Sequence, residues 1–137
     1  MHQPPRYFQQ TTFEAHPRSI GMVRDLVASV PTEHLPTHLV GDLVLVADEL
    51  ATNALTHAGT AFTVSVERVE ATVLLTVTDG SSRLPQQRTP SDDLQPNGRG
   101  LAIVAVLSRH WGVDAQPSGA KSVWAAFDAR ERDDARA

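Results

Sequence analysis

Cysteine is missing from this chain of 137 residues. Its absence excludes disulfide bonds, nucleophilic catalysis by a thiolate and metal sites with thiolate ligands. Chains without disulfides are typical of reducing compartments, and we therefore expect the protein to act in the cytoplasm.

Excess positive charge and long apolar runs are also absent. The formal net charge at pH 7 is -4, so we expect no direct binding to nucleic acid through bulk electrostatics. No apolar run approaches the roughly 20 residues that span a bilayer. The opening stretch MHQPPRYFQQ lacks the basic region and the apolar core of a secretory signal. We expect no membrane partner.

What remains is the composition of an ordinary globular protein, with 41% apolar and 20% charged residues. The length suits one domain over residues 1–137. We expect its core to lie at about 13–127, followed by a flexible charged tail at 128–137.

The spacing of apolar residues predicts three helices and four strands. The expected helices cover residues 17–30, 38–57 and 100–113. The expected strands cover residues 6–15, 62–66, 71–80 and 121–129. Between the third strand and the third helix lies a long polar loop, SSRLPQQRTPSDDLQPNGRG. Loops of this length are commonly functional or disordered. The order of elements favours an α+β fold, a mixed sheet with helices on one face.

The stretch DELATNALTHAG, residues 48–59, is expected to end the second helix. Glu49 and Asn53 lie four residues apart, on one face, and His57 is four residues further along the same line. An Asn oxygen suits Mg²⁺, and a carboxylate one turn earlier can act as a general base. A solvated helix face explains the same pattern.

Asp79 and Gly80 follow an apolar strand in the stretch VTDGSS. A carboxylate there lies at the rim of the core and can accept a hydrogen bond from an exocyclic amine, such as that of adenine. Guanine presents a carbonyl instead, and two acceptors facing each other in a dry pocket would be penalised. An Asp-Gly β-turn is the alternative interpretation.

Two further motifs are weak when taken alone. Gly98 and Gly100 lead into a helix, where free N–H groups bind anions, but many loops end in this way. Lys121 and Ser122 follow Gly119 at the start of the last strand. Lys121 is a candidate phosphate contact and Ser122 a candidate ligand of a base or its bound water, although a hairpin turn explains the same residues.

The order of these motifs makes them specific. The chain resembles the GHKL ATPase superfamily, which includes DNA gyrase and the histidine kinases, through its N-box, G1-box and G2-box. It is most similar to the small stand-alone anti-sigma-factor serine/threonine kinases, especially those of actinomycetes. The resemblance covers about residues 13–127. The matching stretches are DELATNALTHAG, VTDGSSRLP, GRGLAIVAVLSRHWGV and GAKSVWAAF.

The resemblance implies a two-layer α/β sandwich that holds ATP and Mg²⁺ between its helices and a flexible lid. By position, Glu49 is implied to be the general base, Asn53 the Mg²⁺ ligand and Asp79 the reader of adenine. Lys121 matches a basic position, and Ser122 stands where the family usually has Thr and keeps its hydroxyl.

Further positions follow from the same resemblance. The lid is implied at about 85–97, and His57 matches a position that is often His, with a packing or supporting role. Arg24 matches a position implicated in partner contact, although an exposed helical Arg is more often simply solvated. The residues implied to close on the phosphates are Gly98, Arg99, Gly100 and Leu101.

The family's activity and partners are implied as well. Its members transfer the γ-phosphoryl group of Mg-ATP to Ser or Thr of an anti-anti-sigma factor, a STAS-type protein, and also bind and block a sigma factor. Relatives are often dimers, so a homodimer is among the states that the resemblance allows.

One motif departs from the superfamily pattern D-x-G-x-G, because this chain reads DGSSR. Ser81, itself a nucleotide-binding candidate, replaces the first of those motif glycines, which stiffens the loop and can weaken nucleotide binding. The lid also lacks the long glycine run of the larger ATPases.

Three other functions stay open at this point. The domain can be a non-catalytic ATP-binding module that binds a sigma factor or another regulator, a simple nucleotide hydrolase, or the catalytic half of a histidine kinase. The intact pair Glu49 and Asn53 favours the kinase over the module. No helical hairpin with an acceptor His precedes the domain in this sequence, which ranks the histidine kinase low.

Overall fold

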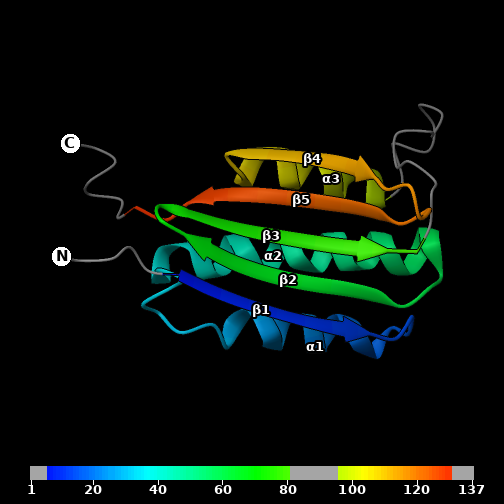
Figure 1. Ribbon diagram of the computed structural model, residues 1–137, viewed down its shortest axis with the longest axis horizontal. Helices are drawn as coiled ribbons and strands as arrows, with labels where there is room; N and C mark the ends of the chain where they lie inside the picture. The colour runs from blue at the N-terminus through cyan, green and yellow to red at the C-terminus, as the bar shows by residue number, and fades with distance from the viewer. Residues whose placement is uncertain (1–5, 81–95, 131–137) are drawn as a thin grey trace.

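The computed structural model of the protein describes residues 6–80 and 96–130, with the backbone alone at 96–100 (Figure 1). Its strands are β1 (Arg6–Phe13), β2 (Phe62–Val69), β3 (Thr72–Asp79), β4 (His110–Ala115) and β5 (Lys121–Asp128). Its helices are α1 (Arg18–Ala28), α2 (Thr37–Asn53), the π-helical turn η1 (Ala54–Ala58) and α3 (Pro96–Leu107).

The strands form one five-stranded sheet in the order β1-β2-β3-β5-β4. The helices lie on one face of it (Figure 1), so the expected α+β two-layer sandwich is confirmed. The expectation of a mixed sheet is corrected, because all four described strand pairs are antiparallel. The chain joins β2 to β3 and β4 to β5 as hairpins, and each hairpin reverses the strand direction.

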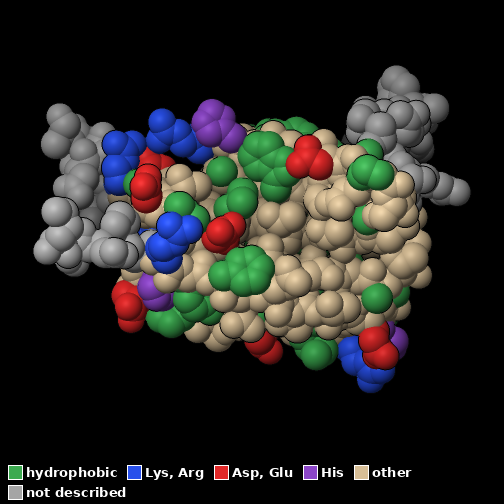
Figure 2. Space-filling model, viewed as in Figure 1, with side chains coloured by type: hydrophobic (Ala, Val, Ile, Leu, Met, Phe, Trp, Pro, Cys, Tyr) green, Lys and Arg blue, Asp and Glu red, His purple; other side chains and the backbone are tan. Residues whose placement is uncertain are grey.

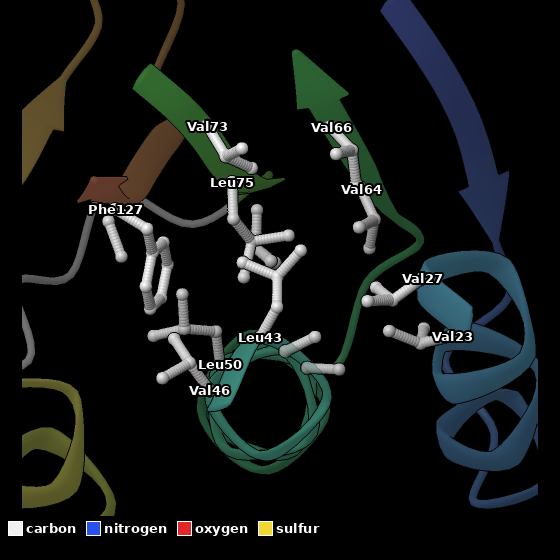
Figure 3. Close-up of a cluster of buried hydrophobic side chains, with 14 of the residues drawn as sticks. Val23, Val27, Leu43, Val46, Leu50, Val64, Val66, Val73, Leu75 and Phe127 are labelled. Atoms are coloured by element: carbon white, nitrogen blue, oxygen red, sulfur yellow. The ribbon is translucent and has the colours of Figure 1, made fainter. Parts of the chain in front are cut away.

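The core lies between α2 and the sheet. Figure 3 shows Leu43, Val46 and Leu50 of α2 pointing toward Leu75 of β3 and Phe127 of β5. All five are buried, and burying one such side chain stabilises a fold by about 1.5–3 kcal/mol. This is the apolar stripe that the sequence predicts for the second helix, and it leaves the other faces of α2 for polar residues.

The structure corrects the expectation of one helix over residues 100–113. α3 ends at Leu107, and β4 begins at His110. The helical spacing of apolar residues does not continue past this break. Trp111 and Val113 alternate with smaller or polar residues, which is the pattern of a strand, and that signal was available in the sequence.

Gly112 in β4 has a packing reason. It lies beside Trp124 of β5, and a Cβ atom added to Gly112 would be 2.7 Å from the indole ring. The two residues are opposite each other in the antiparallel pair. A close approach between a strand backbone and an aromatic ring requires glycine at this position.

The observed α3 also begins at a different residue from the expected helix. It begins at Pro96, four residues earlier than expected, in agreement with the preference of proline for the first helical position. Val104 is fully buried, and Leu101 and Leu107 pack against the core in part. Ala105, between them on the same helix, is exposed.

The described fold extends beyond the expected core, which covers about residues 13–127. β5 runs through Asp128, and the N–H group of Ala129 donates a hydrogen bond of 2.7 Å to the carbonyl of Ala71. The expected flexible tail is therefore anchored at its first residues, and its remainder, 131–137, lies outside the described residues. None of the helices described is both long and apolar enough to cross a bilayer.

Candidate functional site

Four elements meet at one end of the molecule. α2 and β3 finish at this end, while α3 and β5 begin there (Figure 1). The turn η1, which continues α2, contacts β3. This arrangement brings together the four motifs that are far apart in the sequence.

Asn53 is the last residue of α2 and is 9% exposed. Its side-chain oxygen Oδ1 is buried and has no hydrogen-bond partner among the residues described. A buried carbonyl oxygen of this kind costs about 1–3 kcal/mol unless something binds it. Glu49, one turn earlier on the same face, is half-buried. The oxygen of Asn53 is thus available to a cation or a donor that occupies the site.

A π-helical turn follows directly after Asn53. The N–H group of Gly59 donates to the carbonyl of Ala54 at 3.3 Å, and Gly59 then ends the turn with a φ of 65°. A π turn contains more residues than an α turn and often occurs at functional sites. His57 lies within this turn and is half-buried. The expectation that it continues the line of Glu49 and Asn53 stays a prediction.

Asp79 and Lys121 form a buried ion pair at the same end of the sheet. Asp79 is the last residue of β3, Lys121 is the first of β5, and the two are opposite each other in register. Lys121 Nζ lies 3.5 Å from Asp79 Oδ2, and the two side chains are 4% and 3% exposed. The sequence reasoning singled out both residues but did not predict this contact.

Ser122 points to the opposite face of the sheet from Lys121. Its hydroxyl lies 2.7 Å from Thr78 Oγ1 and accepts a hydrogen bond of 3.1 Å from Gln116 Nε2. Successive side chains of a strand alternate between faces, and Lys121 shares the inner face with the core residue Val123. The structure therefore brings Lys121 to Asp79 but keeps Ser122 away from it.

Thr60 is a supporting residue that the sequence reasoning missed. Its hydroxyl Oγ1 accepts a hydrogen bond of 3.1 Å from the N–H group of Gly80. A Cβ atom at Gly80 would lie 3.3 Å from the same hydroxyl, which explains a small residue there. This contact holds the chain where it leaves Asp79, and no motif in the sequence pointed to it.

Other predicted site residues are described only in part. Ser81 and most of the predicted lid, residues 85–95, lie outside the described residues. Gly98, Arg99 and Gly100 lie in the first turns of α3, with the backbone alone described. Leu101 is half-buried and packs against the core.

Arg24, predicted as a partner contact, lies on α1. Its Nη1 atom is 4.0 Å from Asp48 Oδ1 on α2, and the Arg24 side chain is 52% exposed. A contact this long and this exposed contributes little to stability. Arg24 thus remains accessible on the surface of the helical layer, next to the residue that precedes Glu49.

Comparisons with known proteins agree with this geometry. The family model described as the histidine kinase-like ATPase domain matches residues 13–126. The chain is similar to the crystal structure of the RsbU and RsbW domains of Rv1364c from Mycobacterium tuberculosis, with a TM-score of 0.66 and 15% sequence identity. That match covers 89% of this chain and 32% of the other, so this chain spans about a third of it. No curated protein sequence matches the chain.

The structural likeness, at this identity, shows the fold. The family match runs from the end of β1 to within β5 and includes both Asn53 and the pair of Asp79 with Lys121. The resemblance inferred from the motifs is therefore confirmed at this level, and the chain belongs to the histidine kinase-like ATPase domain family.

Proposed function

We propose that this domain binds Mg-ATP and transfers its γ-phosphoryl group to Ser or Thr of a small anti-anti-sigma protein, and thereby controls a sigma factor in the cytoplasm. The observation that carries the proposal is the buried Asn53 oxygen without a partner, at the same end of the molecule as the buried carboxylate of Asp79. Family membership supports ATP as the ligand.

The residues present fit the magnesium and nucleotide that the family implies. Mg²⁺ takes hard oxygen ligands, keeps several waters and usually binds few protein groups together with phosphates. Asn53 Oδ1 is such an oxygen, and because it is buried without a hydrogen-bond partner, binding a cation there would be favourable. When bound, the cation neutralises phosphate charge. Asp79, at the rim of the core, would accept a hydrogen bond from the amine of adenine.

The proposed transfer depends on positioning more than on covalent chemistry. Glu49 would take the proton of the substrate hydroxyl. The hydroxyl oxygen would bond to the γ-phosphorus as the bond between the γ-phosphorus and the bridging oxygen breaks, and ADP would leave with that oxygen. Backbone N–H groups near Gly98 and Gly100, at the start of α3, would hold phosphate oxygens. Arg99, Leu101 and Ser81 are proposed to line the nucleotide.

The proposed partners are a STAS-type anti-anti-sigma factor and a sigma factor. The similar structure from Mycobacterium tuberculosis contains RsbU and RsbW domains, which supports a role in regulation of this type. Arg24, half-exposed beside the α2 residue that precedes Glu49, is proposed to contact a partner.

Calorimetry of ATP binding, with and without Mg²⁺, tests the nucleotide site. We expect Mg-dependent binding by the wild type and a loss of at least about tenfold in affinity for Asn53→Ala, because a ligand to a charged group contributes about 1.5–3 kcal/mol. Thr56→Ala is the matched control, since Thr56 is exposed on the turn that follows Asn53.

Phosphotransfer is tested separately with a STAS-type protein and labelled ATP. Glu49→Gln is expected to bind ATP as the wild type does and to lose transfer. ATP binding without transfer in the wild type would favour the non-catalytic binding module, and no nucleotide binding at all would remove the kinase proposal.

A further inference from the structure

We propose that Lys121 is a second base-reading residue, which donates a hydrogen bond to the ring nitrogen next to the exocyclic amine of adenine. This inference rests on the proposed function and deepens it, because it assigns Lys121 to the base instead of to the phosphates. The structural basis is the juxtaposition of Lys121 Nζ and Asp79 Oδ2, 3.5 Å apart and both buried.

The register of the sheet leaves Lys121 little freedom to reach elsewhere. Lys121 is paired with Asp79 across β3 and β5, and its side chain is 4% exposed on the same face as the core. A lysine that reached out to a phosphate would have to break the ion pair and remove the counter-charge of a buried carboxylate, which is strongly unfavourable. The contact thus holds the ammonium group beside the residue that is expected to read the amine.

The ion pair does not exhaust the capacity of the ammonium group. A lysine carries three N–H donors and no acceptor, and the contact with Asp79 engages at most one of them. A carboxylate beside an ammonium group therefore presents an acceptor next to donors. The amine of adenine is a donor flanked by the ring acceptors N1 and N7, so an adenine edge complements this pair at two points.

The pair also solves an energetic problem of the site. A lone buried carboxylate is costly, and a ligand amine compensates only part of that cost because the amine is neutral. Lys121 neutralises Asp79 within the ion pair, so the two residues carry no net charge together before the base arrives. Asp79 can then be buried at the end of β3 without ligand and still accept the amine.

The test compares ATP with analogues that lack one ring nitrogen, on the wild type and on Lys121→Gln. The analogues are 1-deaza-ATP and 7-deaza-ATP, with 3-deaza-ATP as the control because N3 is remote from the amine. One of the first two is expected to bind the wild type about tenfold more weakly than ATP, as for a hydrogen bond from a charged donor. In Lys121→Gln that loss is expected to shrink to less than about threefold.

Each outcome separates the two proposals. Equal affinity of the wild type for ATP and for both analogues would overturn the role of Lys121 and leave ATP binding intact. The same loss in the wild type and in the variant would also overturn it. No binding of ATP by the wild type would remove the proposed function itself. If Lys121→Gln does not fold, the wild-type series alone still decides whether a ring nitrogen is read, and Lys121→Arg, which keeps a positive charge beside Asp79, provides a second protein for the comparison.

Discussion

The two ends of β5 each carry a carboxylate paired with a basic side chain, in very different surroundings. At the start of the strand, Lys121 and Asp79 are 4% and 3% exposed and lie 3.5 Å apart. At its end, Asp128 is 25% exposed and contacts Arg109 at 3.0 Å and also Arg130. Figure 2 shows charged side chains gathered at the end of the sheet where β5 finishes.

The comparison indicates which ion pair is the better candidate for a role in ligand binding. Surface pairs form readily, are screened by water and salt, and contribute about 0–1 kcal/mol. A buried pair has lost its hydration, and a pair of apolar residues of similar size is often equally stable in its place. Stability alone therefore does not explain Asp79 and Lys121, whereas a ligand that meets both does.

The largest expected effect is that of breaking the buried pair. Lys121→Met should lower the free energy of unfolding by about 3 kcal/mol or more, because the buried carboxylate of Asp79 loses the counter-charge of its ion pair. Urea denaturation followed by circular dichroism measures this. The double variant Asp79→Asn with Lys121→Met is the control and should recover most of the loss. A loss no larger than that of Asp128→Asn would contradict the distinction between the two ends.

The next effect concerns the packing of β4 against the middle of β5, where Gly112 faces Trp124. Gly112→Ala should lower the free energy of unfolding by about 1–3 kcal/mol, because its Cβ atom would lie 2.7 Å from the ring of Trp124. Gly41→Ala is the matched control on α2, where a Cβ atom meets nothing within 4 Å. That control should be stabilised by about 0.5–1 kcal/mol. Thermal unfolding of both variants gives the comparison, and equal melting temperatures would refute it.

A smaller effect is expected at the exposed end of β5. Asp128→Asn should cost less than about 1 kcal/mol, because its partners Arg109 and Arg130 remain solvated when the charge is removed. The loss should shrink further in high salt. Urea denaturation at two salt concentrations measures both, and a loss comparable to that of Lys121→Met would show that the exposed cluster is energetically like the buried one.

The smallest effect is the pH dependence of the contribution that Asp128 makes to stability. Hydrogen bonds from the side chain and the backbone N–H group of Arg130, together with the charge of Arg109, hold the pKa of Asp128 well below its usual value. Because the pKa is lower in the folded state, the stabilisation is complete above the unfolded pKa of about 3.9 and is lost as the pH falls below it. The difference between wild type and Asp128→Asn should therefore be smaller at pH 3 than at pH 7, and a difference that grows on acidification would contradict the assignment.

Much of the fold could be predicted from local pattern. The apolar stripe of α2, with Leu43, Val46 and Leu50, recurs at helical spacing and is buried as expected. The alternation in β2, β3 and β5 was equally clear. The secondary structure of residues 108–115 was harder to predict, because a short edge strand directly after an apolar helix offers few residues from which to read a period.

The sequence could predict which residues belong to the candidate site, but it could not predict the contacts between them. Asn53 and Asp79 stand out because the motifs that contain them occur in the order that the family has. Ser122 and Lys121 are adjacent, and nothing in the local sequence says which of them faces the helices. The π-helical turn after Asn53, which contains His57, also has no clear signature in the sequence.

The amino-acid sequence by itself determined most of the elements, the two layers and the family motifs, because helical and strand periods are local properties of apolar spacing. Only the tertiary structure decided that Lys121 meets Asp79, that Ser122 turns to the outer face and that Gly112 lies beside Trp124. These contacts depend on the register between strands that are distant in the chain. A shift of one residue exchanges the two faces of a strand, and the packing of the whole sheet selects among such registers.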